Sequence, residues 1–425
     1  MALGKPKAPV QTLENLEMKK TLVAIAALAA ATGAMAQSSV ELYGIIDMGY
    51  NKIVSDGTAK ITQTSVGAGA NSANGSGNLN GSRIGFRGKE DLGNGLNAGF
   101  VIEYGVNLTG IGTANTANDA NADALTKESA IGQAGLANVR QGFLSLSKNT
   151  LGTVNVGTQY ALHDATSGAV AGSSATGGTN NVVGASNLLK YGYTGGQPRL
   201  ANAIGYVSPT FSGVTLRAIR NEGKAVTGDS TVAGTSKTNS ANSLAVDYVN
   251  GPLKAGIAQT KYESVGAIAA TGGQTMLVDV LGGGNDRVGA TALAAGTLMN
   301  ITNRVAGAQY NAGFANFGVN RGTYETNALA STAKDIKSGQ TLYSVAVPVA
   351  AGVNVMGGYA TGMLSQGGAD AYKTSAYDLI VVKELSKRTN VYALYVKTKY
   401  TAQATTNSAA DAQQYQYGVG VRHSF

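Results

Sequence analysis

Apolar and polar positions alternate strictly at the end of the chain, over a stretch of twelve residues whose pattern recurs upstream. Between Gln414 and Phe425 one face carries Tyr415, Tyr417, Val419, Val421, His423 and Phe425, and the other carries Gln416, Gly418, Gly420, Arg422 and Ser424. Successive side chains of a β-strand point to opposite faces, so this stretch predicts a strand with two unlike faces. A half-buried strand of a soluble protein also alternates, but an arginine and two glycines on the polar face favour a barrel strand between lipid and a watery lumen.

The same alternation divides residues 39–425 into about sixteen predicted strands. The first covers 39–53, the second 81–90 and the third 95–109, followed by 138–148, 151–160, 201–208 and 213–221. In the first strand, Val40, Leu42, Ile46, Met48 and Tyr50 share one face, while Glu41, Tyr43 and Asp47 share the other. Strands of about ten residues or more can cross a hydrocarbon core at a tilt of about 35–45°.

Short and long connections alternate between these predicted strands. The short ones lie near 91–94, 149–150, Pro209, 250–252, 311–313, 348–352 and 385–389. The long ones cover about 54–80, 110–137, 161–200, 223–241, 264–302, 325–339, 363–373 and 402–412. A membrane barrel with one periplasmic and one external rim explains this alternation. We therefore predict an all-β protein, a closed transmembrane antiparallel β-barrel with an aqueous lumen, since about sixteen strands leave more room than side chains fill.

The first residues indicate export. Lys19 and Lys20 precede an apolar run over 21–31, and Ala34-Met35-Ala36 is a small-residue cleavage site. The run is shorter than the roughly 20 residues of a membrane-spanning helix, so a signal peptide over 18–36 is favoured over an anchor. Residues 1–17 are interpreted as an over-extended start, and 37–425 as one barrel domain.

Composition agrees with this interpretation. The chain has no Cys and no Trp but has 59 Gly and 20 Tyr, which suits many tight turns and an aromatic girdle made of tyrosine. The formal charge of +8 falls to +6 for residues 37–425, because residues 1–36 carry four Lys and two Glu. The basic residues are dispersed among the strands, which argues against a nucleic-acid surface.

Several motifs together resemble those of Gram-negative trimeric general porins of the Neisseria, Burkholderia and Bordetella type. They are the closing strand ending in Phe425, the opening Ser39–Gly44, the hairpin Ser82–Leu96, Arg140–Phe143 with Leu151–Val154, and the turn Leu385–Thr389. The resemblance implies an outer-membrane homotrimer, in contact with lipopolysaccharide, whose water-filled channel passes ions and small hydrophilic solutes without a cofactor. It also implies that Phe425 is an assembly signal.

The resemblance also implies a constriction of the pore. A loop over about 161–198 would fold inward, facing Arg83 and Arg87, with Lys89, Arg140, Glu103 and Asp164 completing the constriction. The alternation places Asp47, Arg217, Lys254 and Arg422 along the lumen. The small excess of lumen cations predicts weak anion preference, although Thr158 and Gly205 stand where the family usually carries charges.

Other functions have weaker support in the sequence. His163-Asp164 could belong to a hydrolase triad on a barrel, but a polar loop histidine explains it better. The acids Asp119, Asp123, Asp279 and Asp286 lack the dense oxygen-ligand spacing of a cation site, so no metal is expected. An adhesin or structural barrel with functional loops is the alternative to a diffusion pore, and a barrel enzyme is less favoured.

Overall fold

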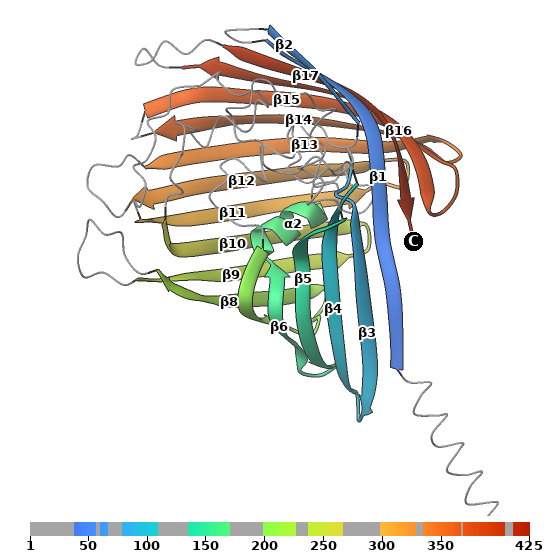
Figure 1. Cartoon of the computed structure of the whole chain (residues 1–425), viewed down its shortest axis with the longest axis vertical. Helices are drawn as coiled ribbons and strands as arrows, with labels where there is room; N and C mark the ends of the chain where they lie inside the picture. The colour runs from blue at the N-terminus through green and yellow to red at the C-terminus, as the bar shows by residue number, and fades with distance from the viewer. Residues whose placement is uncertain are drawn as a thin grey trace, which may run out of the picture.

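A single antiparallel sheet of seventeen strands makes up most of the computed structural model (Figure 1). The structure describes residues 38–56, 60–66, 79–108, 135–170, 199–226, 237–266, 298–328, 335–366, 369–403 and 411–425, so the predicted signal peptide lies outside the described residues. The strands are β1 Ser38–Asp56, β2 Lys60–Val66, β3 Arg83–Gly93, β4 Leu96–Asn107, β5 Gly135–Lys148, β6 Gly152–Tyr160, β7 Arg199–Val207, β8 Val214–Val226, β9 Lys237–Asn250, β10 Leu253–Gly266, β11 Leu298–Asn311, β12 Asn316–Ala328, β13 Ile336–Ala350, β14 Val353–Gln366, β15 Ala369–Glu384, β16 Thr389–Ala402 and β17 Ala412–Ser424. The described part contains no helix of the length and apolarity that crossing a bilayer requires.

The first strand closes the sheet into a barrel. Residues 45–56 of β1 pair with β17, and residues 38–45 pair with β3. Figure 1 shows β1 running from β3 at its lower end to β17 and β2 at its upper end. The short β2 pairs with residues 50–56 of β1, so the ring itself consists of β1 and β3 to β17, which are sixteen strands. The predicted barrel of about sixteen strands is confirmed.

The connections follow the predicted pattern with two exceptions. The connection predicted over 54–80 contains the strand β2, which pairs with β1. The predicted short turns all join strands at one end of the barrel, the short-turn rim, and residues such as 94–95, 251–252 and 351–352 form them. The long connection predicted over 363–373 is wrong, because β14 ends at Gln366 and β15 begins at Ala369. The two strands stay paired as far as Gln366 and Ala369. Their polar ends do not alternate with apolar residues, which is why the pattern suggested a loop there.

The outward face carries an aromatic row of tyrosines. Tyr343, Tyr359 and Tyr377 face one another in register across β13, β14 and β15. The ring centroids of Tyr377 and Tyr395 are 6.0 Å apart, and those of Tyr395 and Tyr417 are 5.2 Å apart. Toward the short-turn rim the outward positions are apolar, as in β15 and β17. Tyrosine alone therefore forms an aromatic row at the edge of the apolar belt, as in other transmembrane barrels.

The inward face is not uniform. On β13 to β16 the inward side chains are buried, and polar residues such as Asp378 and Ser344, at 7% and 8% exposure, lie among apolar ones. The apolar inward side chains have exposed fractions of 0–6%. This set, the apolar inner wall, consists of Leu342, Ala346, Met356, Ala360, Ile380, Val382, Leu394 and Val396.

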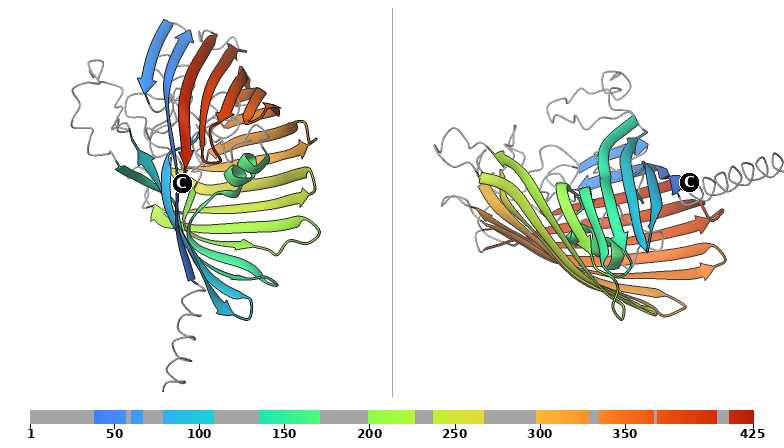
Figure 2. Two further views of the ribbon diagram at one scale, coloured as in Figure 1. Left: turned by 90° about the vertical axis from the view of Figure 1, so that its right-hand side faces the viewer. Right: turned by 90° about the horizontal axis from the view of Figure 1, so that it is seen from below.

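A short helix, α2 (Leu162–Val170), follows β6 and lies inside the barrel (Figures 1 and 2). It contacts β8 to β12. Its partners on these strands, such as Ser243 and Thr260, are buried polar residues, whereas the neighbouring Leu244 and Ile257 are exposed on the outside. The beginning of the predicted inward loop thus packs on the inner wall, and residues 171–198 of that prediction lie outside the described residues.

Candidate functional site

The inward face of β3 carries three cations in a column. Arg83, Arg87 and Lys89 alternate with outward residues such as the exposed Phe86. Arg87 donates two hydrogen bonds of 2.8 Å to the carboxylate of Glu41, its partner across β1 and β3. Both side chains remain about half exposed, at 55% and 56%. Because water screens such a pair, it contributes little to stability, and both charges stay available to passing ions.

A second ion pair lies deeper in the wall. The Nε atom of Arg140 lies 2.7 Å from a carboxylate oxygen of Glu103, with side-chain exposures of 11% and 4%. The Tyr43 hydroxyl donates to the other oxygen of Glu103 at 3.1 Å. Arg83 interacts electrostatically with both Arg140 and Glu103. One carboxylate therefore interacts with two guanidinium groups.

A β-bulge turns Arg140 inward. Leu144 and Leu146 of β5 face outward and are exposed, so simple alternation would place Arg140 on the lipid side. The register between β4 and β5 shifts between Glu103 and Tyr104, which pair with Gln141 and Val139 and leave Arg140 between them. A bulge of this kind re-aims a side chain. The predicted membership of Arg140 in the constriction thus depends on one extra residue in β5.

A second irregularity adds a cation that the sequence analysis missed. The Tyr160 ring lies between two guanidinium groups, 5.9 Å from that of Arg140 and 5.5 Å from that of Arg199. The register between β6 and β7 shifts between Gly157 and Gln159. Gly157 has φ of +136°, where a side chain would collide with the carbonyl oxygen of Gly142. No alternation pattern includes Arg199, because it stands at the very start of β7.

These residues form one surface, here named the cationic inner wall. It contains five cations and two carboxylates: Arg83, Arg87, Lys89, Arg140 and Arg199 against Glu41 and Glu103. This set has an excess of three positive charges; the inward Asp47 of β1 is not part of it, because that residue is fully buried and is paired across the sheet with Arg422 of β17. In a narrow passage such fixed charges select ions by sign.

Gly205, one of the two positions where the family usually carries a charge, has a structural reason for lacking it. A Cβ atom on Gly205 would collide with the side-chain amide of Gln159. Gln159 itself is buried, at 6% exposure. The space that a charged residue at Gly205 would need is therefore filled by a neutral amide, which leaves Arg140 and Arg199 as the cations of this part of the wall.

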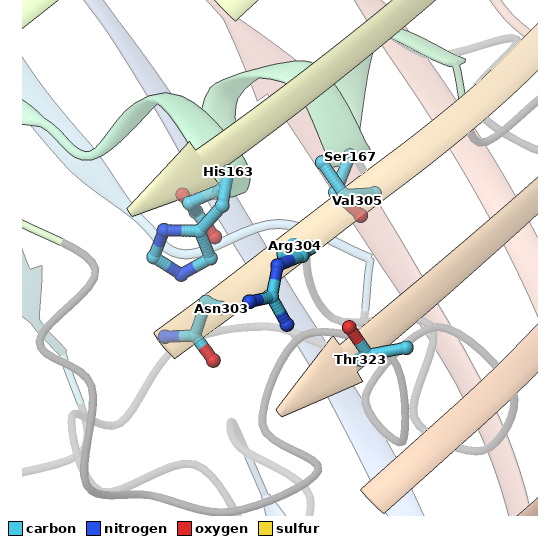
Figure 3. A pocket seen from close by; sticks show the side chains of 7 residues that line it. His163, Ser167, Asn303, Arg304, Val305 and Thr323 are labelled. Atoms are coloured by element: carbon cyan, nitrogen blue, oxygen red, sulfur yellow. The ribbon is translucent and has the colours of Figure 1, made fainter. Parts of the chain in front are cut away.

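Asp164 lies on α2, away from the β3 column and against β9 to β12. The backbone N–H of Leu162 donates to Ser243 at 2.9 Å, and the His163 ring lies 2.8 Å from the Thr260 hydroxyl. Figure 3 shows a small pocket between α2 and the wall, lined by His163, Asp164, Ser167, Asn303, Arg304, Val305 and Thr323. These contacts dock the helix; His163 bonds a wall hydroxyl rather than a catalytic serine.

The four predicted lumen residues face inward but differ in exposure. Lys254 is exposed near the short-turn rim. Arg217 donates two bonds of 2.6 and 2.9 Å to Asp247 and one of 2.8 Å to Thr166 of α2. Asp47 and Arg422 are partners across β1 and β17, and their exposures are 0% and 9%. Arg217 thus anchors α2, and Asp47 and Arg422 are covered by protein.

Phe425 closes the barrel next to β1. Its backbone N–H donates to Gly44 at 3.1 Å and its carbonyl accepts from Gly44 at 3.0 Å. A Cβ atom on Gly44 would collide with the Phe425 ring, so glycine makes room for it. The His423 and Phe425 rings are stacked with centroids 6.5 Å apart. The assembly role of Phe425 stays a prediction.

Comparisons with known proteins agree with this geometry. Residues 22–403 match the Gram-negative porin family. An outer membrane porin protein of Bordetella pertussis is 28% identical, with 96% of this chain and all of the relative covered. Outer membrane porin protein 32 of Delftia acidovorans is also 28% identical, again over 96% of this chain and its own full length.

Among solved structures, an anion-selective porin from Comamonas acidovorans aligns with a TM-score of 0.60 at 22% identity, covering 91% of this chain and all of that one. At this identity the likeness concerns the fold. The family match and the two porin relatives indicate that the barrel is a channel protein and not an enzyme. The chain belongs to the Gram-negative porin family and forms a porin channel of the outer membrane.

Proposed function

We propose that the channel is a general diffusion pore with a weak preference for anions, set by the cationic inner wall. The observation that supports this is the excess of five cations over two carboxylates in the residues of that wall. Charges on a wide lumen are screened within a Debye length of about 8 Å at physiological salt. Residues that narrow the passage therefore weigh most, and Arg83 and Arg87 lead that set.

The sign of the selectivity is tested by the purified protein in a planar bilayer under a salt gradient. Discrete conductance steps and a zero-current potential displaced toward the anion equilibrium potential are expected. A displacement toward the cation equilibrium potential would reject the proposed selectivity. An absence of steps from correctly folded protein would reject the pore in favour of a structural barrel.

We also infer that three copies assemble through the outward face of β1 and β3 to β6. This face carries exposed aliphatic residues beside Phe86: Val40, Leu42, Leu144 and Val156 are all exposed by more than half. The in-register tyrosine row lies instead on β13 to β15, where an aromatic row suits the lipid interface. Replacement of Leu144 by Glu should dissociate the trimer in mild detergent, whereas Tyr359→Ser on the lipid-facing side should leave it intact.

Anionic lipid of the outer leaflet is the expected partner of the belt above the tyrosine row. Arg321, Lys337 and Lys373 are exposed on the outward side of β12, β13 and β15. Cations at that level suit the phosphates of lipopolysaccharide. The triple change of these residues to Ser should reduce the lipopolysaccharide phosphate that copurifies with the barrel, and an unchanged phosphate content would remove this belt as the contact.

Phe425 is proposed as an assembly signal. Its side chain occupies one small site beside Gly44, so its loss removes at most about 1.5–3 kcal/mol of burial. Deletion of Phe425 should therefore lower the amount of barrel assembled in cells far more than the stability of protein refolded in detergent. Equal yields of assembled barrel from the truncated and full-length chains in cells would contradict the proposal that Phe425 is an assembly signal.

A further inference from the structure

The end of the first connection lies on the inner side of the barrel. Residues 79–82 precede β3, yet Leu79, Asn80 and Ser82 are buried at 0–1% exposure. Their partners come from β1, β16 and β17. A segment outside the strand ladder is therefore held within the barrel by side chains of three strands.

Asp47 is the centre of the attachment. One of its carboxylate oxygens accepts the backbone N–H groups of Leu79 at 3.0 Å and Asn80 at 2.7 Å. The other accepts the Tyr392 hydroxyl at 2.6 Å. The Ser82 hydroxyl donates to the backbone carbonyl of Asp47 at 3.2 Å. Both oxygens of a fully buried carboxylate thus accept hydrogen bonds, and the bonds from Leu79 and Asn80 come from the segment.

Arg422 holds the same segment from β17. Its guanidinium donates to the side-chain carbonyl of Asn80 at 2.7 Å. Arg422 is also the cross-strand partner of Asp47 and interacts with it electrostatically. The hydrogen bonds to Asp47 and the neighbouring Arg422 offset part of the cost of burying this carboxylate.

The Leu79 side chain packs against the apolar inner wall. It is completely buried in a cluster with Ala346, Met356, Ile380, Val382, Tyr392, Leu394 and Val396. Apolar residues on the inside of a water-filled barrel need a cover, since exposing them costs about 25 cal/mol for each Å². Leu79 contributes to that cover, and the bonds to Asp47 keep it in place.

The segment also leads directly into the constriction. The Arg83 Nε donates to the carbonyl of Gly81 at 3.0 Å, and the backbone N–H of Val106 donates to the carbonyl of Ser82 at 2.9 Å. The position of Arg83 on the cationic inner wall thus depends on where residues 81–82 are held.

We propose that residues 79–82 are a fixed inner lining of the pore, which Asp47, Tyr392 and Arg422 latch to the wall, and that this lining limits the open cross-section and positions Arg83. The inference rests on the proposed diffusion function for its electrical consequences, but the latch itself does not. Asp47, Tyr392 and Arg422 are positioning residues. Removing the carboxylate leaves two buried N–H donors without an acceptor, so the segment leaves the wall and water reaches the apolar residues beneath.

The direct test is thiol accessibility. The chain has no cysteine, so single replacements report one position each. Leu79→Cys should react slowly with a water-soluble methanethiosulfonate reagent, and the Asp47→Ala, Leu79→Cys double variant should react at least about tenfold faster, because bonds to a charged acceptor are lost. Lys89→Cys, an exposed position of the lumen, is the matched control and should react fast with either residue at position 47.

Single-channel recording gives the second readout. The Asp47→Ala channel should have a larger conductance and admit larger sugars in liposome swelling, and Tyr392→Phe should have a smaller effect in the same direction. Folding is controlled by the migration of the unheated protein as a folded barrel on a gel. If the Asp47→Ala variant does not fold by this criterion, the Tyr392→Phe, Leu79→Cys double variant takes its place in the labelling experiment. Leu79→Cys reacting as fast as Lys89→Cys, or protection that survives both latch variants, would overturn the proposal. If the parent protein never conducts, the proposed diffusion function is rejected. The labelling rates would still show whether Asp47 and Tyr392 hold residues 79–82 on the wall.

Discussion

Two inner walls of the same barrel have opposite chemistry. The cationic inner wall, on β1 and β3 to β7, carries charged side chains, and its pair Arg87–Glu41 is about half exposed to solvent. The apolar inner wall, on β13 to β16, has exposed fractions of 0–6%. Both walls alternate with period two, and both face inward. Alternation therefore fixes which residues point inside, but not whether water is there.

The difference identifies where ions can pass. A charged residue on a hydrated wall keeps most of its solvation and acts on passing ions through a screened field. A residue on the covered wall contributes by packing, as Leu79 and Met356 do. The permeation path should thus follow β1 and β3 to β7, and substitutions on the two walls should have separate consequences, in stability on one and in selectivity on the other.

The largest effect is expected from a charge on the apolar inner wall. Met356 is fully buried, so Met356→Asp loses its packing and buries an unpaired carboxylate, at a cost of about 5 kcal/mol or more. We expect little assembled barrel, measured as the heat-modifiable band of outer-membrane fractions. Lys89→Asp puts the same side chain on the exposed wall and should assemble normally; equal yields for both variants would mean that the β13 to β16 wall is hydrated.

A smaller loss of stability should separate the two ion pairs of the cationic wall. Glu103→Gln removes the negative charge beside a guanidinium with 11% exposure and should lower the free energy of unfolding by about 3 kcal/mol. Glu41→Gln removes the exposed partner of Arg87 and should change it by less than about 1 kcal/mol. Both changes in the free energy of unfolding can be measured by urea unfolding of the refolded barrel. The signal is circular dichroism or tyrosine fluorescence, since the chain has no Trp. Similar losses would show that Arg140 is as hydrated as Arg87.

The bulge in β6 can be tested with a matched pair of glycines. Gly157→Ala forces a side chain against the Gly142 carbonyl at φ of +136°, whereas Gly93 has φ of +83° with nothing within 4 Å. Gly93→Ala should cost about 1–2 kcal/mol, the cost of a left-handed conformation, and Gly157→Ala should cost more. The melting temperature in detergent gives the order, and a milder effect at Gly157 would mean that the bulge rearranges freely.

The fold could be predicted from the sequence because it repeats one local rule. Alternation and turn residues are enough to place nearly every strand. They fail where pairing is irregular or distant: the bulge at Arg140, the cation at Arg199 and the two-residue connection after Gln366. Asp47 was expected along the lumen, and it faces inward. It is buried in contacts with distant residues, among them the Tyr392 hydroxyl, which is 345 residues away in sequence, and no local pattern contains that contact.

The central claim, that fixed cations on one wall set the selectivity, is tested most directly by the zero-current potential of an Arg83→Ser, Arg87→Ser double variant under a salt gradient. Its control is Arg321→Ser, Lys337→Ser, which removes two cations exposed on the outside. The account predicts that the lumen variant still conducts and its potential moves to zero or beyond, while the control keeps the anion preference of the parent. A lumen variant with the parent's potential would contradict the account and place the selectivity elsewhere.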